Sequence, residues 1–258
     1  MSTDAFLDVR EVTKRFGGFQ ALSAVSLRMR QGERFGLIGP NGSGKTTLIN
    51  CISGTLRTDG GHIVFEDRDI TTLAAHRPTR LGIARSFQIP KPFTSMTVLE
   101  NLMIPIEYAR QGHHDGVVGE AMGILEQVGL AAKARVLSAA LTQIEMRKLE
   151  LARAMAARPK LLVSDEAMAG LSSTEVDDIL AILFGLNARG ITIIMIEHIM
   201  RAVMRFSERI AVLDAGEKIA EGGPEEILAN ERVERAYLGE LARAPERRRG
   251  LRRHPCPA

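Results

Sequence analysis

Apolar and polar positions alternate along the first third of the chain, with the two-residue period of a half-buried β-strand. The alternation runs through residues 7–12 and 22–29, and an uninterrupted apolar run follows at residues 35–38 after a turn at residues 31–33. A further short apolar segment lies at residues 63–65. Together these segments predict a strand-rich N-terminal region.

Strand-like and helix-like segments alternate after residue 159. Residues 161–164, 191–196 and 210–213 are apolar runs of strand length, and the stretch 172–190 opens with the capping box Ser172-Ser-Thr-Glu175, which predicts a helix. Strands separated by helices favour a parallel sheet with helices on its faces. The middle of the chain, in contrast, has helical features only, because capping boxes open at Thr97 and Thr142 and no strand-like run intervenes.

The composition is that of a globular protein, with 45% hydrophobic and 25% charged residues. The longest purely apolar run, residues 191–196, is shorter than the roughly 18 residues of a membrane span. The N-terminal sequence lacks the pattern of a secretory signal, and Cys51 and Cys256 cannot form a disulfide framework. These observations predict a cytoplasmic protein.

The positive charge is concentrated at the C-terminus. The chain carries a net charge of +3, of which residues 241–258 contribute six Arg and one Glu, so the first 240 residues carry −2. Duplex binding usually needs a basic surface on the folded domain, so no nucleic-acid partner is expected. We expect one domain over residues 1–240, with a core at 6–89 and 159–240 and an inserted helical subdomain at 90–158. A disordered basic tail follows, for which attraction to anionic lipid is the alternative reading.

Residues 39–46, GPNGSGKT, match the phosphate-binding pattern G-x-x-x-x-G-K-[S/T] and lie between an apolar strand and a predicted helix. Glycines there let backbone N–H groups surround a phosphate at a helix N-terminus, where the helix dipole also favours anions. Lys45 is expected to bridge the β- and γ-phosphates of ATP, and the Thr46 hydroxyl to ligate Mg²⁺. The alternatives are a chance glycine-rich turn and a dinucleotide fold, for which G-x-G-x-x-G is missing. The residues expected to contact ATP here are Gly39, Pro40, Asn41, Gly42, Ser43, Gly44, Lys45, Thr46 and Thr47.

Two carboxylates follow the apolar segment 161–164. Asp165, at the carboxyl end of the predicted strand, is placed to hold Mg²⁺ through water, and Glu166 to polarise the water that attacks the γ-phosphate. Adjacent carboxylates repel each other, so plain surface charge explains them poorly. Gln88 and His198 also follow predicted strands, whose ends should meet near the nucleotide, although a lone glutamine or histidine is more often a surface or capping residue.

The order of these motifs resembles that of ATP-binding cassette (ABC) ATPases: GPNGSGKTT, Gln88, LTQIE, VSDE, AGLS and His198. The resemblance covers residues 6–240 and extends to the ATPase subunits of branched-chain amino acid importers through KRFGGFQAL, ARSFQ with MTVLENL, AEGGPEEI and AYLG. RSFQIPKPF is similar to the larger of that family's two paired ATPase subunits, and urea and short-amide importers share the same phrases. The fold implied is an α/β P-loop NTPase (RecA-like) core with an N-terminal antiparallel β subdomain and an inserted α-helical subdomain.

The resemblance implies roles for single residues. Phe16 would stack on adenine, Gln88 would sense the γ-phosphate and Mg²⁺ and signal to the permease, and His198 would contact the γ-phosphate. Mg²⁺ would be held by Thr46, Gln88 and Asp165. Residues 169–172 would link two sites across a dimer. Two ATP molecules would lie between two subunits, each between one chain's phosphate loop and the other chain's signature segment.

The signature segment here departs from the family's usual Leu-Ser-x-Gly-Gln. Thr142 keeps the hydroxyl, while Ile144 replaces the glycine and Glu145 the glutamine. Thr142 and Glu145 form a capping box, and an early helical position does not need a positive φ, so Ile144 is compatible with the fold. Because helical side chains lean toward the N-terminus, Ile144 is expected to point toward the partner's γ-phosphate and to impair that site. Ser164 within the apolar strand and Ala167 in place of the usual proline are smaller departures.

The resemblance implies an ATP-binding and ATP-hydrolysing subunit that energises an ABC importer for branched-chain or related amino acids. Its partners would be integral-membrane permease subunits, a second ATPase subunit in a hetero- or homodimer, and indirectly a periplasmic or extracellular solute-binding protein. ATP and Mg²⁺ would be its cofactors, and the permease would hold it at the inner face of the cell membrane. One alternative is a regulatory subunit with a degenerate composite site beside a more active ATPase. Another is a soluble nucleic-acid-associated ABC ATPase, against which the acidic body and the single cassette argue.

Overall fold

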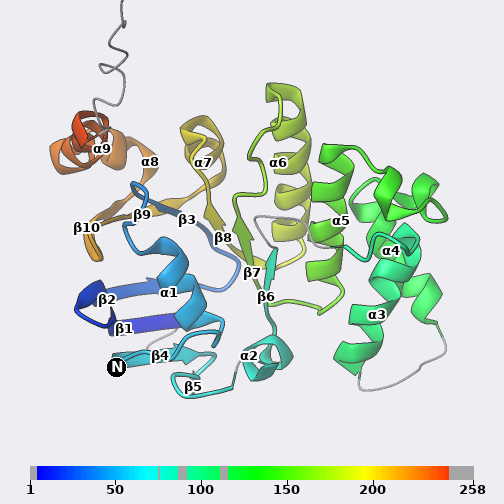
Figure 1. The fold of residues 1–258 in the computed structure, drawn as a ribbon, viewed down its shortest axis with the longest axis horizontal. Helices are drawn as coiled ribbons and strands as arrows, with labels where there is room; N and C mark the ends of the chain where they lie inside the picture. Colours follow the sequence, from blue (N-terminus) through cyan, green and yellow to red (C-terminus); the bar gives the residue numbers. More distant parts are fainter. Residues whose placement is uncertain (1–4, 75, 87–91, 111–115, 244–258) are drawn as a thin grey trace, which may run out of the picture.

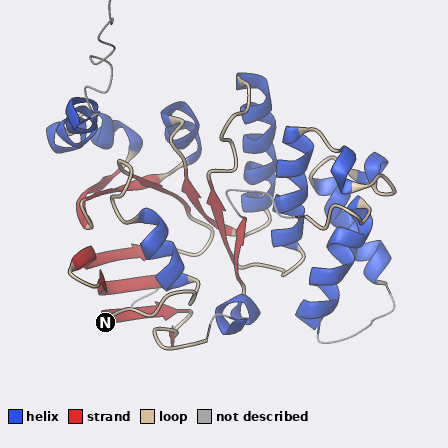
Figure 2. Ribbon diagram, viewed as in Figure 1, coloured by secondary structure: helices blue, strands red, loops and turns tan. Residues whose placement is uncertain are grey.

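The computed structural model describes residues 5–74, 76–86, 92–110 and 116–243, which form two β-sheets with helices around them (Figure 1, Figure 2). One sheet has the strand order β2-β1-β4-β5, and the other has the order β10-β9-β3-β8-β7-β6. The predicted α/β class with an antiparallel N-terminal sheet is confirmed.

The four-stranded sheet is antiparallel throughout. Val9 lies opposite both Leu27 and Ile63, and all three side chains are fully or almost fully buried, which explains the apolar alternation along these strands. This sheet therefore turns one apolar face inward. Its strands are β1 (Leu7–Phe16), β2 (Phe19–Met29), β4 (Gly60–Phe65) and β5 (Arg68–Asp69).

The six-stranded sheet is parallel except at β10, which pairs antiparallel with β9. Strands β7 and β8 are buried along their whole length, so their sequences are mainly apolar rather than alternating, with Ser164, Asp165 and Thr192 as buried polar positions. The carboxyl ends of the parallel strands meet at one edge of the sheet, where the predicted site residues follow. The strands are β3 (Arg34–Ile38), β6 (Ile83–Ser86), β7 (Leu161–Asp165), β8 (Thr192–Ile196), β9 (Arg209–Asp214) and β10 (Glu217–Gly222).

Three of the helices begin with the capping boxes that the sequence predicts, at Thr97, Thr142 and Ser172. At the first box the Thr97 N–H donates to Glu100 Oε2 (2.7 Å) and the Glu100 N–H donates to Thr97 Oγ1 (3.2 Å). The helices are α1 (Lys45–Ile52), α2 (His76–Leu81), α3 (Val98–Arg110), α4 (Val117–Gln127), α5 (Gln143–Met155), α6 (Ser173–Ala188), α7 (Met200–Phe206), α8 (Pro224–Leu228) and α9 (Glu231–Arg243), with 3₁₀ turns at Ala131–Lys133 and Ser138–Ala140.

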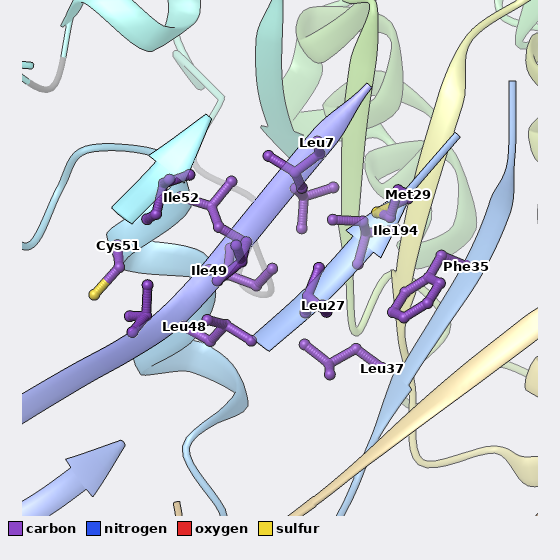
Figure 3. Close-up of a cluster of buried hydrophobic side chains, with 14 of the residues drawn as sticks. Leu7, Leu27, Met29, Phe35, Leu37, Leu48, Ile49, Cys51, Ile52 and Ile194 are labelled. Carbon is purple, nitrogen blue, oxygen red and sulfur yellow. The ribbon is translucent and has the colours of Figure 1, made fainter. Parts of the chain in front are cut away.

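Three buried clusters hold these elements together. The first fills the space between the two sheets, where α1 lies, and Figure 3 shows Leu27, Leu37 and Ile49 among its members. The second packs α6 and α7 on the other face of the six-stranded sheet. The third joins α3, α4 and α5, which follow one another in the chain between β6 and β7. The helical segment is thus an insertion between two neighbouring strands, as predicted, whereas its proposed limits at residues 90 and 158 stay a prediction.

Candidate functional site

The phosphate-binding pattern forms the loop between β3 and α1, on the edge of the sheet where the parallel strands end. Two of its glycines are required by the surroundings. Gly39 has φ of 150°, and a Cβ there would lie 2.0 Å from the Leu213 carbonyl oxygen. Gly44, the N-cap residue of α1, has φ of 102°, and its Cβ would lie 2.7 Å from the Ala21 carbonyl oxygen. The loop therefore keeps its backbone bare because strands β2 and β9 leave no space for side chains.

Lys45 occupies the first helical position of α1 and is buried. Its Nζ donates to the carbonyl oxygens of Gly39 (2.7 Å) and Pro40 (2.9 Å), and lies 3.4 Å from Ser43 Oγ. The ammonium group is therefore held inside the curve of the loop, next to the N-terminus of a helix. This arrangement places a cation and backbone dipoles together, as phosphate binding requires.

A cavity of about 260 Å³ opens at this loop, and its lining joins three elements that are distant in sequence. Phe16 and Phe19 come from the β1–β2 turn, with 48% and 64% of their surfaces exposed, and Glu166 comes from the end of β7. Exposed aromatic rings beside a phosphate site offer a stacking surface for a base. Phe16 thus lines the same cavity as the loop, while its stacking on adenine stays a prediction; sequence reasoning did not single out Phe19, although it flanks the same Gly-Gly turn. The loop residues in the lining are Asn41, Gly42, Ser43, Gly44, Lys45, Thr46 and Thr47.

Glu166 and His198 are in direct contact. Glu166 Oε1 lies 2.8 Å from His198 Nε2, and the Glu166 N–H donates to the Ile196 carbonyl oxygen at 2.8 Å. Glu166 also has φ of 48°, a left-handed conformation that is uncommon for a residue with a Cβ. Such strain persists only where the surroundings impose it and is concentrated at functional sites. The carboxylate and the imidazole predicted to face the γ-phosphate are therefore brought together beside the phosphate-binding loop.

Asp165 is almost fully buried and is bound by an arginine that the sequence analysis did not single out. Arg85, on β6, donates from Nε to Asp165 Oδ2 (3.2 Å) and from Nη2 to the same oxygen, and its Nη1 donates to Asn50 Oδ1 (2.6 Å) in α1. The pairing of β6 with β7 brings Arg85 to this position, since Ser86 and Ser164 are neighbours across the two strands. A long-range pair of this kind leaves no local signal in the sequence.

The residues at this edge fit a magnesium ion bound together with ATP. Mg²⁺ is usually held by one or two carboxylates together with substrate phosphates and waters, and Asp165 and the exposed Thr46 supply such oxygens near the loop. Within the ranges that the structure describes, there is no cluster of three His, Cys, Asp or Glu side chains that could bind a metal without a substrate. Gln88, the third predicted ligand, lies outside the described residues.

The signature segment starts α5 and takes no part in the lining of the 260 Å³ cavity. The Glu145 N–H lies 3.4 Å from Thr142 Oγ1, and the Thr142 N–H donates to Glu145 Oε2 at 2.9 Å, so the predicted box is confirmed. Ile144 is half-buried and packs against the hydrophobic cluster that also contains Met168 and Val176. Part of its side chain is therefore directed at its own chain, rather than wholly toward a partner as expected from helix geometry.

None of the helices in the described ranges combines the length and apolarity needed to cross a membrane.

Comparison with known proteins agrees with this geometry. The model of the ABC transporter family matches residues 22–169, and that of the branched-chain amino acid ATP-binding cassette transporter matches residues 217–242. The high-affinity branched-chain amino acid transport ATP-binding protein LivG of Salmonella typhimurium is 38% identical over 251 residues, which cover 91% of this chain and 98% of LivG. BraF of Pseudomonas aeruginosa, which carries the same description, is 37% identical with the same coverage.

Two solved structures share the fold. A nucleotide-free ATP-binding cassette from an ABC transporter is 35% identical with a TM-score of 0.84, covering 90% of this chain and 98% of that one. A cassette in its ADP conformation is 34% identical with a TM-score of 0.85, covering 92% and 100%. The family match over more than half of the chain, together with these relatives, shows that the chain belongs to the ABC transporter family of ATP-binding cassettes.

Proposed function

We propose that this chain hydrolyses ATP and thereby energises an ABC importer for branched-chain or related amino acids. The observation that carries the proposal is the convergence of Lys45, Phe16 and Glu166 on one cavity, with His198 bonded to Glu166. The relatives LivG and BraF, which are branched-chain amino acid transport ATP-binding proteins, support the substrate class. Urea and short amides are the competing class of solute, since importers of those solutes share the same sequence phrases.

Each residue of the cavity has a part in hydrolysis that follows from its chemistry. The adenine base stacks on the Phe16 side of the cavity, and the triphosphate lies along the loop, where Lys45 neutralises the β- and γ-phosphates. Glu166 accepts a hydrogen bond from the attacking water and polarises it. His198 fixes the Glu166 side chain through their 2.8 Å contact and faces the γ-phosphate. Asp165, Thr46 and Gln88 would hold Mg²⁺, which would supply charge neutralisation at the β- and γ-phosphates.

We also propose that a cytoplasmic segment of the permease docks in a groove of about 410 Å³ between the sheet and the helical insertion. The groove is lined by α2, β6, α3, α5 and the residues that follow α1, and it combines Pro105 and the exposed Tyr108 with Arg80, Arg85 and Arg153. Arg85 pairs with Asp165, and Arg153 pairs with Glu150, which also lines the groove. A lining that mixes apolar groups with charges of both signs suits an amphipathic segment. Docking there would hold the chain at the inner face of the membrane. It would also place the permease segment next to Arg85, which binds Asp165.

The proposal is tested by transport. Cells that lack this gene are expected to lose uptake of labelled leucine or valine, and a plasmid copy is expected to restore it whereas a Glu166→Gln copy is not. If leucine and valine uptake is unchanged and urea uptake is lost, the transported solute is urea or a short amide rather than a branched-chain amino acid. Purified protein without ATPase activity, alone and with its permease, would overturn the enzymatic assignment itself.

A second candidate function is favoured by Ile144. A regulatory subunit would bind ATP with its intact phosphate-binding loop but would complete a slow site for its partner, because a β-branched residue stands in the signature. Single-turnover hydrolysis by the assembled transporter separates the two, since one fast and one slow site give two phases whereas two equal sites give one.

A further inference from the structure

The segment that carries Glu166 is tied to the end of β8 by a row of three contacts. We call residues 165–169 the catalytic turn. Within it, the Glu166 N–H donates to the Ile196 carbonyl oxygen at 2.8 Å, and Glu166 Oε1 lies 2.8 Å from His198 Nε2. The third contact is made by Glu197, which lies between Ile196 and His198 in the chain. The Met168 N–H donates to Glu197 Oε1 at 2.8 Å. The first two contacts involve the proposed catalytic residues, while Glu197 belongs to none of the motifs GPNGSGKT, LTQIE and VSDE.

Glu197 is a buried carboxylate with only 3% of its surface exposed. Burial raises the pKa of its carboxyl group to about 7, and repulsion from Glu166 acts in the same direction. Hydrogen bonds from the Met168 and His198 N–H groups and the charge of Arg147 act in the opposite direction. An acid is costly to bury and is retained where its hydrogen bonds serve a purpose, and this one precedes His198 in the chain and accepts a hydrogen bond from the segment that carries Glu166.

The other end of the catalytic turn is held by the signature helix. Gln143 Nε2 and Arg147 Nη2, both on α5, lie 3.4 Å from the Ala169 carbonyl oxygen. Arg147 is buried and attracts Glu197 electrostatically, so the helix that starts with the signature and the end of β8 face each other across the turn. Side chains on both sides therefore hold the turn, in addition to its internal hydrogen bond from the Ala169 N–H to the Glu166 carbonyl oxygen (3.3 Å).

The backbone of the turn gives such a tether a role. Glu166 has φ of 48°, which is strained for a residue with a Cβ and needs outside support. Residue 167 is alanine, which restricts the backbone less than a proline would. The hydrogen bond from the Met168 N–H to Glu197 restrains the backbone directly after Ala167.

We propose that Glu197 is a positioning residue of the hydrolytic site: by accepting the Met168 N–H, it holds the catalytic turn in the conformation that keeps Glu166 against His198. Glu197 does not touch the reacting atoms and acts only through the turn. The inference rests on the proposed hydrolysis of ATP, and it predicts that loss of the acceptor lowers kcat while leaving the KM for ATP near its parent value. The phosphate-binding loop, which dominates ATP binding, is on another element.

The test compares Glu197→Ala with Glu197→Gln. The amide oxygen of glutamine reaches as far as the carboxylate and can accept the Met168 N–H, whereas alanine cannot. Glu197→Ala is expected to lower kcat by about 10²-fold, the loss typical of a catalytic group displaced by about 1 Å. Glu197→Gln is expected to stay close to the parent. Hydrogen–deuterium exchange of the peptide over residues 165–170 is expected to accelerate in the alanine variant only.

A matched control is Glu150→Ala. Glu150 is similarly buried, at 4% exposure, but it pairs with Arg153 on α5, so its loss is expected to leave exchange at residues 165–170 unchanged. If Glu197→Ala does not fold, Glu197→Asp replaces it, since the shorter carboxylate keeps the charge but draws the acceptor back from Met168. Equal kcat and exchange in the alanine or aspartate variant and the parent would overturn the proposal, as would a glutamine variant as slow as alanine. The exchange measurement needs no hydrolysis, so inactive parent protein would count against the proposed function alone.

Discussion

Arg85 directs two of its nitrogens at a single oxygen of Asp165, where the neighbouring strands β6 and β7 end. Its third nitrogen donates to Asn50 in α1, the helix that starts at the phosphate-binding loop. One guanidinium group thus orients the carboxylate expected to hold Mg²⁺ and also contacts the helix that carries Lys45. The same side chain lines the groove proposed to receive the permease, so changes there have a short physical route to the nucleotide.

Replacing Arg85 with methionine should therefore disturb both stability and metal binding. A buried charged acceptor left without its donors costs about 1–3 kcal/mol or more, and loss of a group that orients a metal ligand typically weakens metal affinity by about 10–100-fold. Urea unfolding and Mg²⁺ titration at fixed ATP analogue measure the two effects. Arg205→Met, which breaks an exposed pair with Asp177, should cost less than about 1 kcal/mol and leave Mg²⁺ binding alone. Unchanged Mg²⁺ affinity in Arg85→Met would show that Arg85 does not orient the ligand.

Lys45→Ala is expected to abolish tight binding of Mg-ATP. The Nζ of Lys45 lies within the loop and is the cation that can bridge the phosphates, and its contacts to Gly39 and Pro40 also hold the loop in shape. Equilibrium titration with a fluorescent ATP analogue measures the loss. Affinity equal to that of the parent would contradict the assignment of this loop as the phosphate site.

Glu166→Gln should keep nucleotide binding and nearly stop hydrolysis. An amide cannot take a proton from the attacking water, and loss of a general base typically lowers the rate by about 10²- to 10⁴-fold. The variant should also accumulate as an ATP-bound dimer, which size-exclusion chromatography with ATP detects. Hydrolysis at the parent rate would remove Glu166 from the mechanism.

Ile144→Gly should raise the ATPase rate of the isolated protein, because bare backbone at this position can approach a partner's γ-phosphate. The structure adds a cost: Ile144 is half-buried against a core cluster, so its loss should lower stability by about 1–3 kcal/mol, including the lower helix propensity of glycine. Ile144→Ala is the control, since it loses the same packing but keeps a Cβ. Rates are compared at equal folded fraction by circular dichroism. If the parent is already fast and glycine slows it, Ile144 is an adapted signature residue.

The buried acid Glu197 should make stability depend on pH near neutrality. Its carboxyl pKa rises from the ordinary value of 4.5 to about 7 on folding, so the folded state binds the proton more tightly than the unfolded chain. The resulting contribution is complete below pH 4.5 and is lost as the pH rises through about 7. Glu197→Gln, which stays neutral, should gain stability relative to the parent between pH 5 and 8, on the order of 3 kcal/mol in total. Parallel pH curves of unfolding free energy for the two proteins would show that the acid is not perturbed.

The positions of the phosphate-binding loop and of the two neighbouring carboxylates were predictable from sequence. The phosphate-binding loop is encoded by glycines and a lysine at fixed spacing, and Asp165 and Glu166 follow an apolar strand directly, so each signal lies within a few residues. The capping boxes at Thr97, Thr142 and Ser172 are local in the same way, and the structure confirms all three.

The supporting contacts could not be predicted, because they join positions distant in sequence. Arg85 meets Asp165 across 80 residues, and Glu197 meets Met168 across 29, so only the order of strands in the sheet makes them neighbours. The C-terminal elements were missed for another reason. Strand β10 is an edge strand with half-exposed or exposed side chains, so it lacks the apolar run that marked β7 and β8.

The capping box at the start of α5 has a consequence for how such subunits diverge. Thr142 and Glu145 fix the first turn of this helix between themselves, so a change at position 144 costs side-chain packing but leaves the start of the helix in place. Natural selection can then act on that position according to the pace of the transport cycle, within the limit that this packing sets. After gene duplication, two copies that differ only there would keep the same fold and the same partners, yet would divide the work of the cycle unequally between their ATP sites.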